Sequence, residues 1–167
     1  MEVTGTGWRR RHVAVIGAAR ASAGECEAAA QVGRRIAEAG AVLVCGGLGG
    51  VMEAACRGAR EAGGTTVGIL PGGDRSEAND YVDVAIATGI GEARNAVVVA
   101  TADAVVAVGG EYGTLSEIAL ALKAGTPVIG FDSWELRRRG EPVVGVRPAG
   151  SPDEAAALAL EHGRPPA

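Results

Sequence analysis

The chain has 167 residues, of which 47% are hydrophobic and only 3% aromatic, and its formal net charge is −4. This length suits one domain, and a core so poor in aromatic residues must be built from Ala, Val, Ile and Leu. The negative charge gives no electrostatic reason to expect nucleic acid as a partner. Because no apolar stretch is long and uninterrupted enough to cross a bilayer, we also expect no membrane partner.

Runs rich in β-branched residues alternate along the chain with segments of helical periodicity. In chain order, strands are predicted at residues 13–16, 41–45, 66–70, 82–87, 104–108 and 127–131, with an edge strand at 143–146. Helices are predicted at residues 25–39, 51–62, 92–102, 115–124 and 153–162. Residues 72–80 form a polar loop long enough to act as a lid, and residues 134–140 are predicted to be irregular. We expect residues 1–11 and 163–167 to be flexible.

Repeated strand–helix–strand units predict an α/β fold, a doubly wound and mostly parallel sheet of about six to seven strands with helices on both faces. Residues 1–167 would then form a single Rossmann-like domain. In such sheets ligands bind beyond the carboxyl ends of the strands, near the point where the strand order reverses. A ligand site is therefore expected at that edge.

Two glycine-rich turns follow predicted strands at this edge. The first is Gly46-Gly47-Leu48-Gly49-Gly50, and the second is Gly109-Gly110-Glu111-Tyr112-Gly113-Thr114-Leu115-Ser116-Glu117. Glycines there let backbone amides approach an anion, and the helix that follows adds partial positive charge. The alternative is that the glycines only permit tight turns. Neither turn is a Walker A loop, because the lysine of that motif is missing. Together they predict a nucleotide-binding site, with the anion approached by the backbone of Gly46, Gly47, Gly49, Gly50, Gly109, Gly110 and Gly113.

Three charged residues lie near these turns. Glu117 either caps its helix by bonding the backbone of Thr114 or faces the ligand, where a carboxylate could stabilise positive charge at an anomeric carbon. Arg94 opens a helix against the macrodipole, so it is either a solvated side chain or the partner of a carboxylate or an anionic ligand. Arg20 follows the first strand and is either a surface residue or an anion contact.

The cysteines give no sign of a metal site or a disulfide. Cys26, Cys45 and Cys56 are odd in number and lack CxxC spacing, so they are predicted to be small buried residues in a reducing cytoplasm. The run from Arg9 to Arg11 with its apolar continuation imitates an export signal, but Arg20 falls where cleavage would occur. We therefore expect a cytoplasmic protein without a metal.

The second turn resembles the hallmark PGGxGTxxE of the LOG family, Rossmann-like proteins often labelled as lysine decarboxylases. The Gly-Gly pair, the Gly-Thr pair and the final Glu117 match, and the resemblance spans roughly residues 13–131. It implies a homodimer or higher homo-oligomer that needs no cofactor and hydrolyses nucleoside 5′-monophosphates to a free base and ribose 5-phosphate. By this resemblance, Glu117 is the catalytic carboxylate and Arg94 its partner at the ribosyl site, while the glycine turns and Thr114 hold phosphate.

Three departures from the hallmark point to a second function. Val108 replaces proline, one extra residue separates the Gly-Gly and Gly-Thr pairs, and Asn95 follows Arg94 where the enzymes have lysine. These features look closer to a branch that includes the molybdenum cofactor carrier proteins, which bind a pterin phosphate without turning it over. The alternative function is therefore a non-catalytic binder, either a molybdenum cofactor carrier or a nucleotide sensor, and a nucleoside monophosphate and the molybdenum cofactor both stay open as the phosphorylated ligand. A pyridoxal phosphate decarboxylase is excluded, because the only lysine, Lys123, ends a helix at the opposite edge of the sheet.

Overall fold

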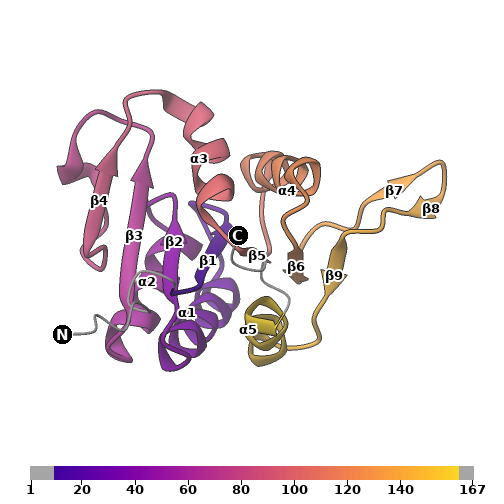
Figure 1. Cartoon of the computed structure of the whole chain (residues 1–167), viewed down its shortest axis with the longest axis horizontal. Coiled ribbons are helices and arrows are strands. Elements are labelled where there is room, and N and C mark those ends of the chain that lie inside the picture. Colours follow the sequence, from indigo (N-terminus) through magenta and orange to yellow (C-terminus); the bar gives the residue numbers. More distant parts are fainter. Residues whose placement is uncertain (1–9, 162–167) are drawn as a thin grey trace, which may run out of the picture.

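Seven strands form one parallel sheet in the computed structural model, which describes residues 10–161 (Figure 1). The strand order is β4-β3-β2-β1-β5-β6-β9, and every pairing in this sheet is parallel. The strands are β1 (His12–Gly17), β2 (Val42–Cys45), β3 (Thr65–Leu70), β4 (Val84–Ala87), β5 (Ala104–Val108), β6 (Val128–Phe131) and β9 (Val146–Pro148). The order reverses between β1 and β5, which confirms the predicted doubly wound α/β sheet.

Helices cover both faces of the sheet. On one face lie α1 (Ala23–Glu38), α2 (Val51–Glu61) and α5 (Pro152–Glu161), which appear below the sheet in Figure 1. On the other lie α3 (Arg94–Thr101) and α4 (Tyr112–Ala124). Two short 3-10 turns, Arg75–Glu77 and Gly91–Ala93, interrupt the connections on either side of β4. Among residues 10–161, no helix is long and apolar enough to span a membrane.

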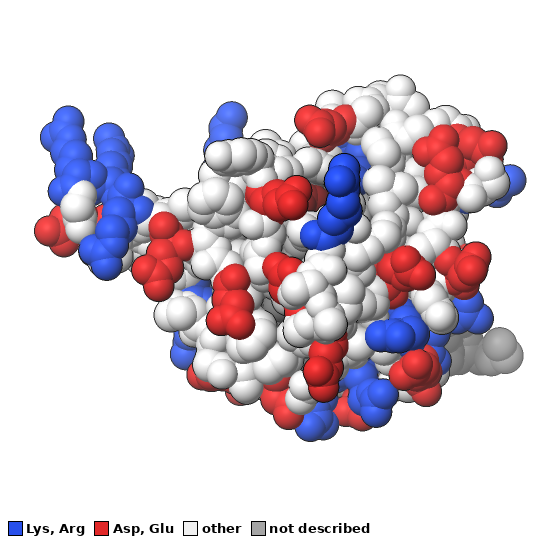
Figure 2. Space-filling model, turned by 180° about the vertical axis from the view of Figure 1, so that it is seen from behind, with Lys and Arg blue, Asp and Glu red and all other residues white. Residues whose placement is uncertain are grey.

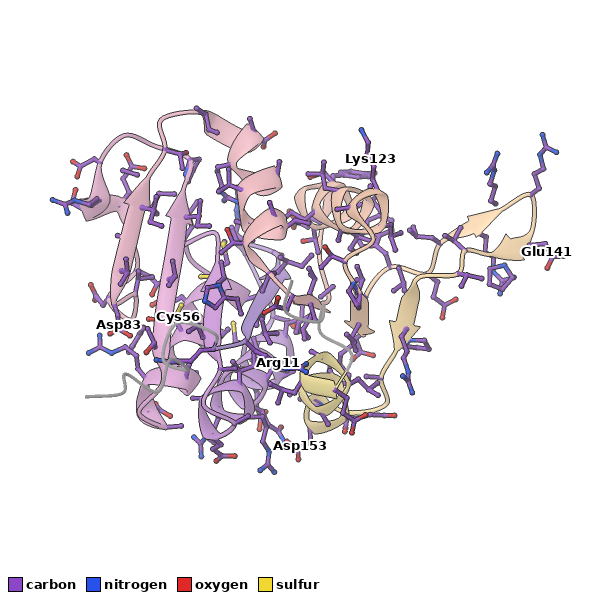
Figure 3. The ribbon with its side chains drawn as sticks, viewed as in Figure 1. Arg11, Cys56, Asp83, Lys123, Glu141 and Asp153 are labelled. Carbon is purple, nitrogen blue, oxygen red and sulfur yellow. The ribbon has the colours of Figure 1, made fainter. Side chains whose placement is uncertain are left out.

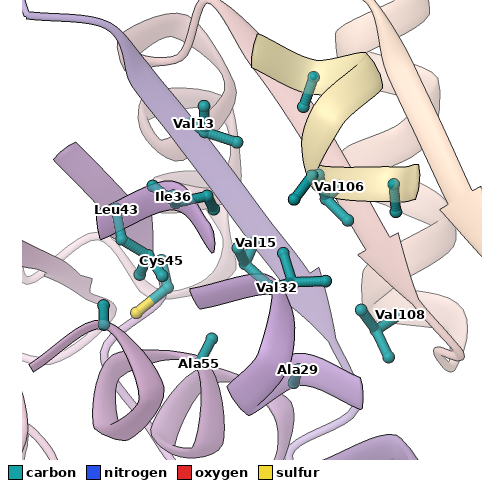
Figure 4. Close-up of a cluster of buried hydrophobic side chains, with 14 of the residues drawn as sticks. Val13, Val15, Ala29, Val32, Ile36, Leu43, Cys45, Ala55, Val106 and Val108 are labelled. Carbon is teal, nitrogen blue, oxygen red and sulfur yellow. The ribbon is translucent and has the colours of Figure 1, made fainter. Parts of the chain in front are cut away.

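The core is made of small aliphatic side chains, as the composition predicts. Figure 4 shows Val13 and Val15 of β1 packing with Val32 and Ile36 of α1. Because successive residues of a strand point to opposite faces, Ala14 and Ile16 join the second cluster, under α3 and α4. Strands buried on both faces need continuous apolar runs, which explains why their positions were predicted well.

Glycines bring α1 and α2 unusually close together. A Cβ at Gly33 would lie 2.0 Å from the carbonyl oxygen of Ala55, and one at Gly58 would lie 1.9 Å from that of Ala30. The start of α1 is fixed by the predicted capping box, in which the Ser22 side chain accepts from the Glu25 N–H at 3.2 Å and Glu25 accepts from the Ser22 N–H at 2.7 Å. This helix pair thereby forms a rigid support behind β1 and β2.

The structure corrects the prediction in the segment after β6. Residues 134–140 were predicted to be irregular, but β7 (Arg137–Arg138) and β8 (Glu141–Pro142) pair into an antiparallel hairpin. The turn has positive φ at both Arg139 and Gly140, as a two-residue hairpin turn of type I′ requires. Figure 1 shows this arm projecting from the body. The edge strand that follows is β9, later in the chain than the predicted 143–146.

Two helix starts also differ from the prediction. The helix predicted from residue 92 begins with the 3-10 turn, so that Arg94 is the first residue of α3. Helix α4 begins at Tyr112 rather than at residue 115, with Glu111 as its N-cap. Of the ends expected to be flexible, residues 1–9 and 163–167 lie outside the described residues, whereas Arg10 Nε donates to the carbonyl of Gly40 at 3.1 Å.

Candidate functional site

A cavity of about 320 Å³ opens at the carboxyl edge of the sheet, where β1, β2 and β5 end. Its size is that of a site for a small organic ligand. Its lining comes from the ends of β1 and β2, from residues around the start of α3 and from the first turns of α4. The lining residues are Val15, Ile16, Gly17, Ala18, Ala19, Gly46, Leu48, Met52, Pro71, Glu92, Arg94, Asn95, Glu111, Gly113, Thr114 and Glu117.

Arg94 and Glu117 form a buried charged pair in this cavity. Nη1 of Arg94 lies 3.7 Å from Oε1 of Glu117, and the two side chains are 10% and 9% exposed. Burial raises the pKa of Glu117 to about 7, although the charge of Arg94 acts in the opposite direction. The capping alternative for Glu117 is wrong, because Glu111 is the N-cap of α4 and Glu117 lies well inside the helix.

The guanidinium of Arg94 is held by its neighbours, but its Nε has no hydrogen-bond partner among residues 10–161. Nη1 donates to Oδ1 of Asn95, and Asn95 Nδ2 donates to Ser116 Oγ at 3.3 Å. On another side the guanidinium lies against Gly46, where an added Cβ would be 2.7 Å from Nη2. Nε of Arg94 is buried and has no hydrogen-bond partner among residues 10–161. A buried unpaired donor is costly, so this atom points to a ligand acceptor.

Backbone amides around the cavity supply further donors. The N-caps of α2 and α4, Gly50 and Glu111, make no side-chain capping bond. Within the described part of the chain, the amides of Leu48, Gly49 and Gly50 have no acceptor. Two helix starts without a side-chain cap thus border the same cavity as a buried arginine, an arrangement suited to an anion such as phosphate, although the first amide of α2, from Val51, already donates to the carbonyl of Ala18 at 3.0 Å.

The structure brings most of the predicted site residues to this cavity, but not all of them. Gly46, Gly113, Thr114, Arg94 and Glu117 line it, and Gly47, Gly49 and Gly50 belong to the same turn as Gly46. The amide of Gly47 donates to Cys45 Sγ at 3.3 Å, so it is already engaged. Arg20 is exposed and does not line the cavity.

Gly109 and Gly110 face a neighbouring hollow instead. The amide of Gly109 donates to the carbonyl of Phe131 at 3.0 Å. The carboxylate of Glu25 lies against this turn, because a Cβ added to Gly109 would be 1.9 Å from Oε1 of Glu25. Hydrogen bonds from Ser22 and from the backbone of Gly110 hold the pKa of Glu25 below its ordinary value. An acidic side chain of the chain itself therefore occupies the anion position at this turn.

Sequence reasoning missed Ser116 and Asn79, which support the cavity from outside its lining. Ser116 is within the second glycine motif, and its hydroxyl links that motif to Asn95, because it donates to the carbonyl of Gly113 at 2.7 Å and accepts from Asn95 Nδ2 at 3.3 Å. Asn79 contacts the first glycine turn from a loop more than thirty residues away, and no local pattern marks such a residue. Figure 3 shows Lys123 projecting outward from α4, as expected for a lysine without a catalytic role.

The hairpin arm offers a different surface. Figure 2 shows basic side chains gathered on this arm, which carries Arg137, Arg138 and Arg139. A hollow of about 430 Å³ lies between the arm and β6, lined by Trp134 among others. It contains no buried pair of opposite charges and no helix N-terminus, so we place the candidate site at the cavity of Arg94 and Glu117. Among residues 10–161, no group of three or more His, Cys, Asp or Glu side chains is placed to hold a metal ion.

Comparison with known protein families identifies the group to which this arrangement belongs. The model of the SLOG cluster4 family matches residues 10–156. The chain belongs to this family. An uncharacterized protein of Archaeoglobus fulgidus is 52% identical over 111 residues, which are 64% of this chain and 73% of that protein.

Solved structures with the same fold include two that bear directly on the site. The molybdenum cofactor binding protein of Rippkaea orientalis is 39% identical, with a TM-score of 0.83 over 92% of this chain and 97% of its own. The molybdenum cofactor carrier protein of Chlamydomonas reinhardtii is 34% identical, with a TM-score of 0.78 over 92% of this chain and 98% of its own. The chain is thus similar over nearly its whole length to proteins named for this cofactor.

Proposed function

We propose that this protein is a carrier that binds the molybdenum cofactor, a phosphorylated pterin, without turning it over. The observation that carries the proposal is the buried Arg94, whose Nε has no hydrogen-bond partner among residues 10–161 and which lines one cavity together with residues from the starts of α2 and α4, two helices without a side-chain cap. The likeness to the proteins of Rippkaea orientalis and Chlamydomonas reinhardtii supports the pterin phosphate as the ligand.

Each part of the cavity has a role in this proposal. Arg94 neutralises the phosphate and donates hydrogen bonds to it, and the amides of Leu48, Gly49 and Gly50 add neutral donors. Glu117, with a pKa of about 7, is partly protonated at neutral pH and so repels a phosphate less than an ionised carboxylate would. The cofactor is cargo here, so no side chain has to assist a bond-breaking step.

A second candidate is a nucleoside 5′-monophosphate phosphoribohydrolase. The observation that favours it is Glu117 itself, a buried carboxylate 3.7 Å from Arg94 and inside the cavity. In this reaction water adds to the anomeric carbon of ribose 5-phosphate while the bond to the base breaks, and the base leaves with a proton. An ionised Glu117 would stabilise the positive charge that develops on the sugar.

Binding and turnover measured on the same variants separate the two functions. Anaerobic equilibrium dialysis with molybdenum cofactor, followed by mass spectrometry of molybdenum, should give at least tenfold weaker binding for Arg94→Gln. An exposed arginine far from the cavity, Arg34, gives the matched control Arg34→Gln. The carrier proposal expects Glu117→Gln to bind nearly as well as the wild type and expects no adenine from AMP.

The opposite result would favour the hydrolase. Wild-type protein would then release adenine from AMP, detected by chromatography, and Glu117→Gln would abolish the release. Failure of the wild type to retain the cofactor would refute the carrier proposal.

We also propose that the protein is a homodimer. Val98 and Val99 of α3 are covered by their own chain, but Val97 is 39% exposed. Nearby elements of the chain, β4 and the segment before α3, expose Val84, Ile86 and Ile90. Burying such apolar side chains against a second copy would be favourable. Sedimentation equilibrium at micromolar concentration should show a dimer, and Val97→Glu should shift it toward monomer; a monomeric wild type would refute this proposal.

A further inference from the structure

One side chain of the loop between β3 and β4 reaches back to the glycine turn after β2. Nδ2 of Asn79 donates to the carbonyl of Leu48 at 2.8 Å and to that of Gly47 at 3.3 Å. The backbone N–H of Asn79 also donates to the carbonyl of Gly47, at 2.9 Å. Oδ1 accepts from the N–H of Tyr81 at 3.0 Å, so both ends of this amide are fixed.

The segment that presents Asn79 is itself anchored to the body. Arg60 of α2 donates to the carbonyl of Asp80 at 3.1 Å. The hydroxyl of Thr66, in β3, donates to the carbonyl of Tyr81 at 2.6 Å. Asn79 therefore stands on a rigid support, and the end of the loop that was expected to act as a lid is tied down.

The contacts of Asn79 determine which way the turn presents its amides. In a trans peptide the C=O and the next N–H point in opposite directions. Since the carbonyls of Gly47 and Leu48 point to Asn79, the N–H groups of Leu48 and Gly49 point away from it. Leu48 lines the cavity and Asn79 does not, and within the described chain these two amides have no acceptor. Positive φ at Gly47 and Gly50 allows such successive amides to converge on one anion.

We propose that Asn79 is the positioning residue of the phosphate-binding turn. It holds the carbonyls of Gly47 and Leu48, so that the amides of Leu48 and Gly49 are already aimed at the phosphate before the ligand arrives. This inference rests on the proposed function, because it takes phosphate as the group bound in the cavity. Without Asn79 the turn must reorient its peptides during binding, and affinity falls.

The variant Asn79→Asp tests this role with inorganic phosphate as the probe. It keeps the shape, the acceptor for Tyr81 and the backbone bond to Gly47, but it loses the side-chain donor to both carbonyls, which is the described side-chain contact of residue 79 to Leu48. Titration followed by the amide shifts of Leu48 and Gly49 in NMR spectra should show phosphate binding to the wild type, and on the order of tenfold weaker binding to the variant. Asn79→Ala, which adds no charge near the carbonyls, serves if Asn79→Asp does not fold and should weaken binding in the same way.

The matched control is Thr101→Val, which removes another side-chain bond to a backbone carbonyl, from Thr101 to Val97 at 2.7 Å, in the last turn of α3 and outside the cavity lining. It should lower stability without changing the phosphate affinity. Equal affinity in Asn79→Asp, Asn79→Ala and the wild type would overturn the inference, and so would a wild type whose Leu48 and Gly49 amides do not respond to phosphate. If the inference about Asn79 fails but the wild type still retains the molybdenum cofactor, the carrier proposal stands. If the wild type binds neither phosphate nor the molybdenum cofactor, the carrier proposal is refuted.

Discussion

The raised pKa of Glu117 makes a quantitative prediction for the variant Glu117→Gln. The pKa rises from an ordinary value of 4.5 to about 7 because the side chain is buried, at 9% exposure. Each pKa unit corresponds to about 1.4 kcal/mol, so ionisation of Glu117 costs the folded state about 3 kcal/mol at a pH above both values. Solvent screening takes little from this figure at so low an exposure.

The sign follows from the direction of the shift. Because the folded pKa lies above the unfolded one, the stability present below pH 4.5 is lost as the pH rises through about 7. Glutamine is neutral at every pH, so the variant Glu117→Gln does not lose this stability as the pH rises. Between pH 4 and pH 8.5, the free energy of unfolding of Glu117→Gln should therefore increase by about 3 kcal/mol relative to that of the wild type.

Urea unfolding of both proteins across this pH range measures the difference, in which the titration of all other groups largely cancels. Carbon-13 NMR of labelled glutamate provides a direct check, with a midpoint for Glu117 near 7. A difference in unfolding free energy that does not change with pH would refute the argument, since it would mean that burial does not favour the protonated carboxyl.

Two further substitutions test parts of the structure. Gly46→Ala should displace the guanidinium of Arg94, which lies 2.7 Å from the new Cβ, and weaken cofactor binding about tenfold in dialysis. Gly24→Ala, which meets nothing within 4 Å, is its control and should leave binding unchanged. Arg139→Asn should raise the free energy of unfolding by about 1 kcal/mol in urea, because Arg139 has a φ of 54° and asparagine tolerates that conformation better. An unchanged or lower stability would show that the Arg139 side chain stabilises the arm.

The sheet could be predicted from sequence because its central strands are buried on both faces. β1 and β5 are continuous aliphatic runs bounded by polar residues or glycine, and both were placed to within one residue. The arm could not be predicted in the same way. It is exposed, so burial leaves no pattern, and its turn puts Arg139 at a position where glycine or asparagine would have given the signal.

Only those residues of the candidate site that are unusual in their local sequence could be predicted. Arg94 and Glu117 could be named because an arginine in the first turn of a helix and a carboxylate in a glycine motif are unusual locally. Asn79 acts across the fold, through carbonyls that look like any others in sequence. The role of the Gly109–Gly110 turn also depends on a distant contact, because Glu25 comes from a different helix and already occupies it.

The extra residue between the two glycine pairs has a structural meaning that bears on function. Glu111 becomes the N-cap of α4, so Tyr112 opens the helix and Thr114 lies within its first turn. Glu117 then follows by about one further turn, since a helix has 3.6 residues per turn. Its side chain packs against Arg94 rather than at the helix start, where the free amides would hold a phosphate. An anion at these amides and the carboxylate of Glu117 are therefore separate features of one cavity. This separation fits a carrier, and it equally fits a hydrolase whose carboxylate acts at the anomeric carbon, so the binding and turnover of Glu117→Gln, rather than its position, decide between the two proposed functions.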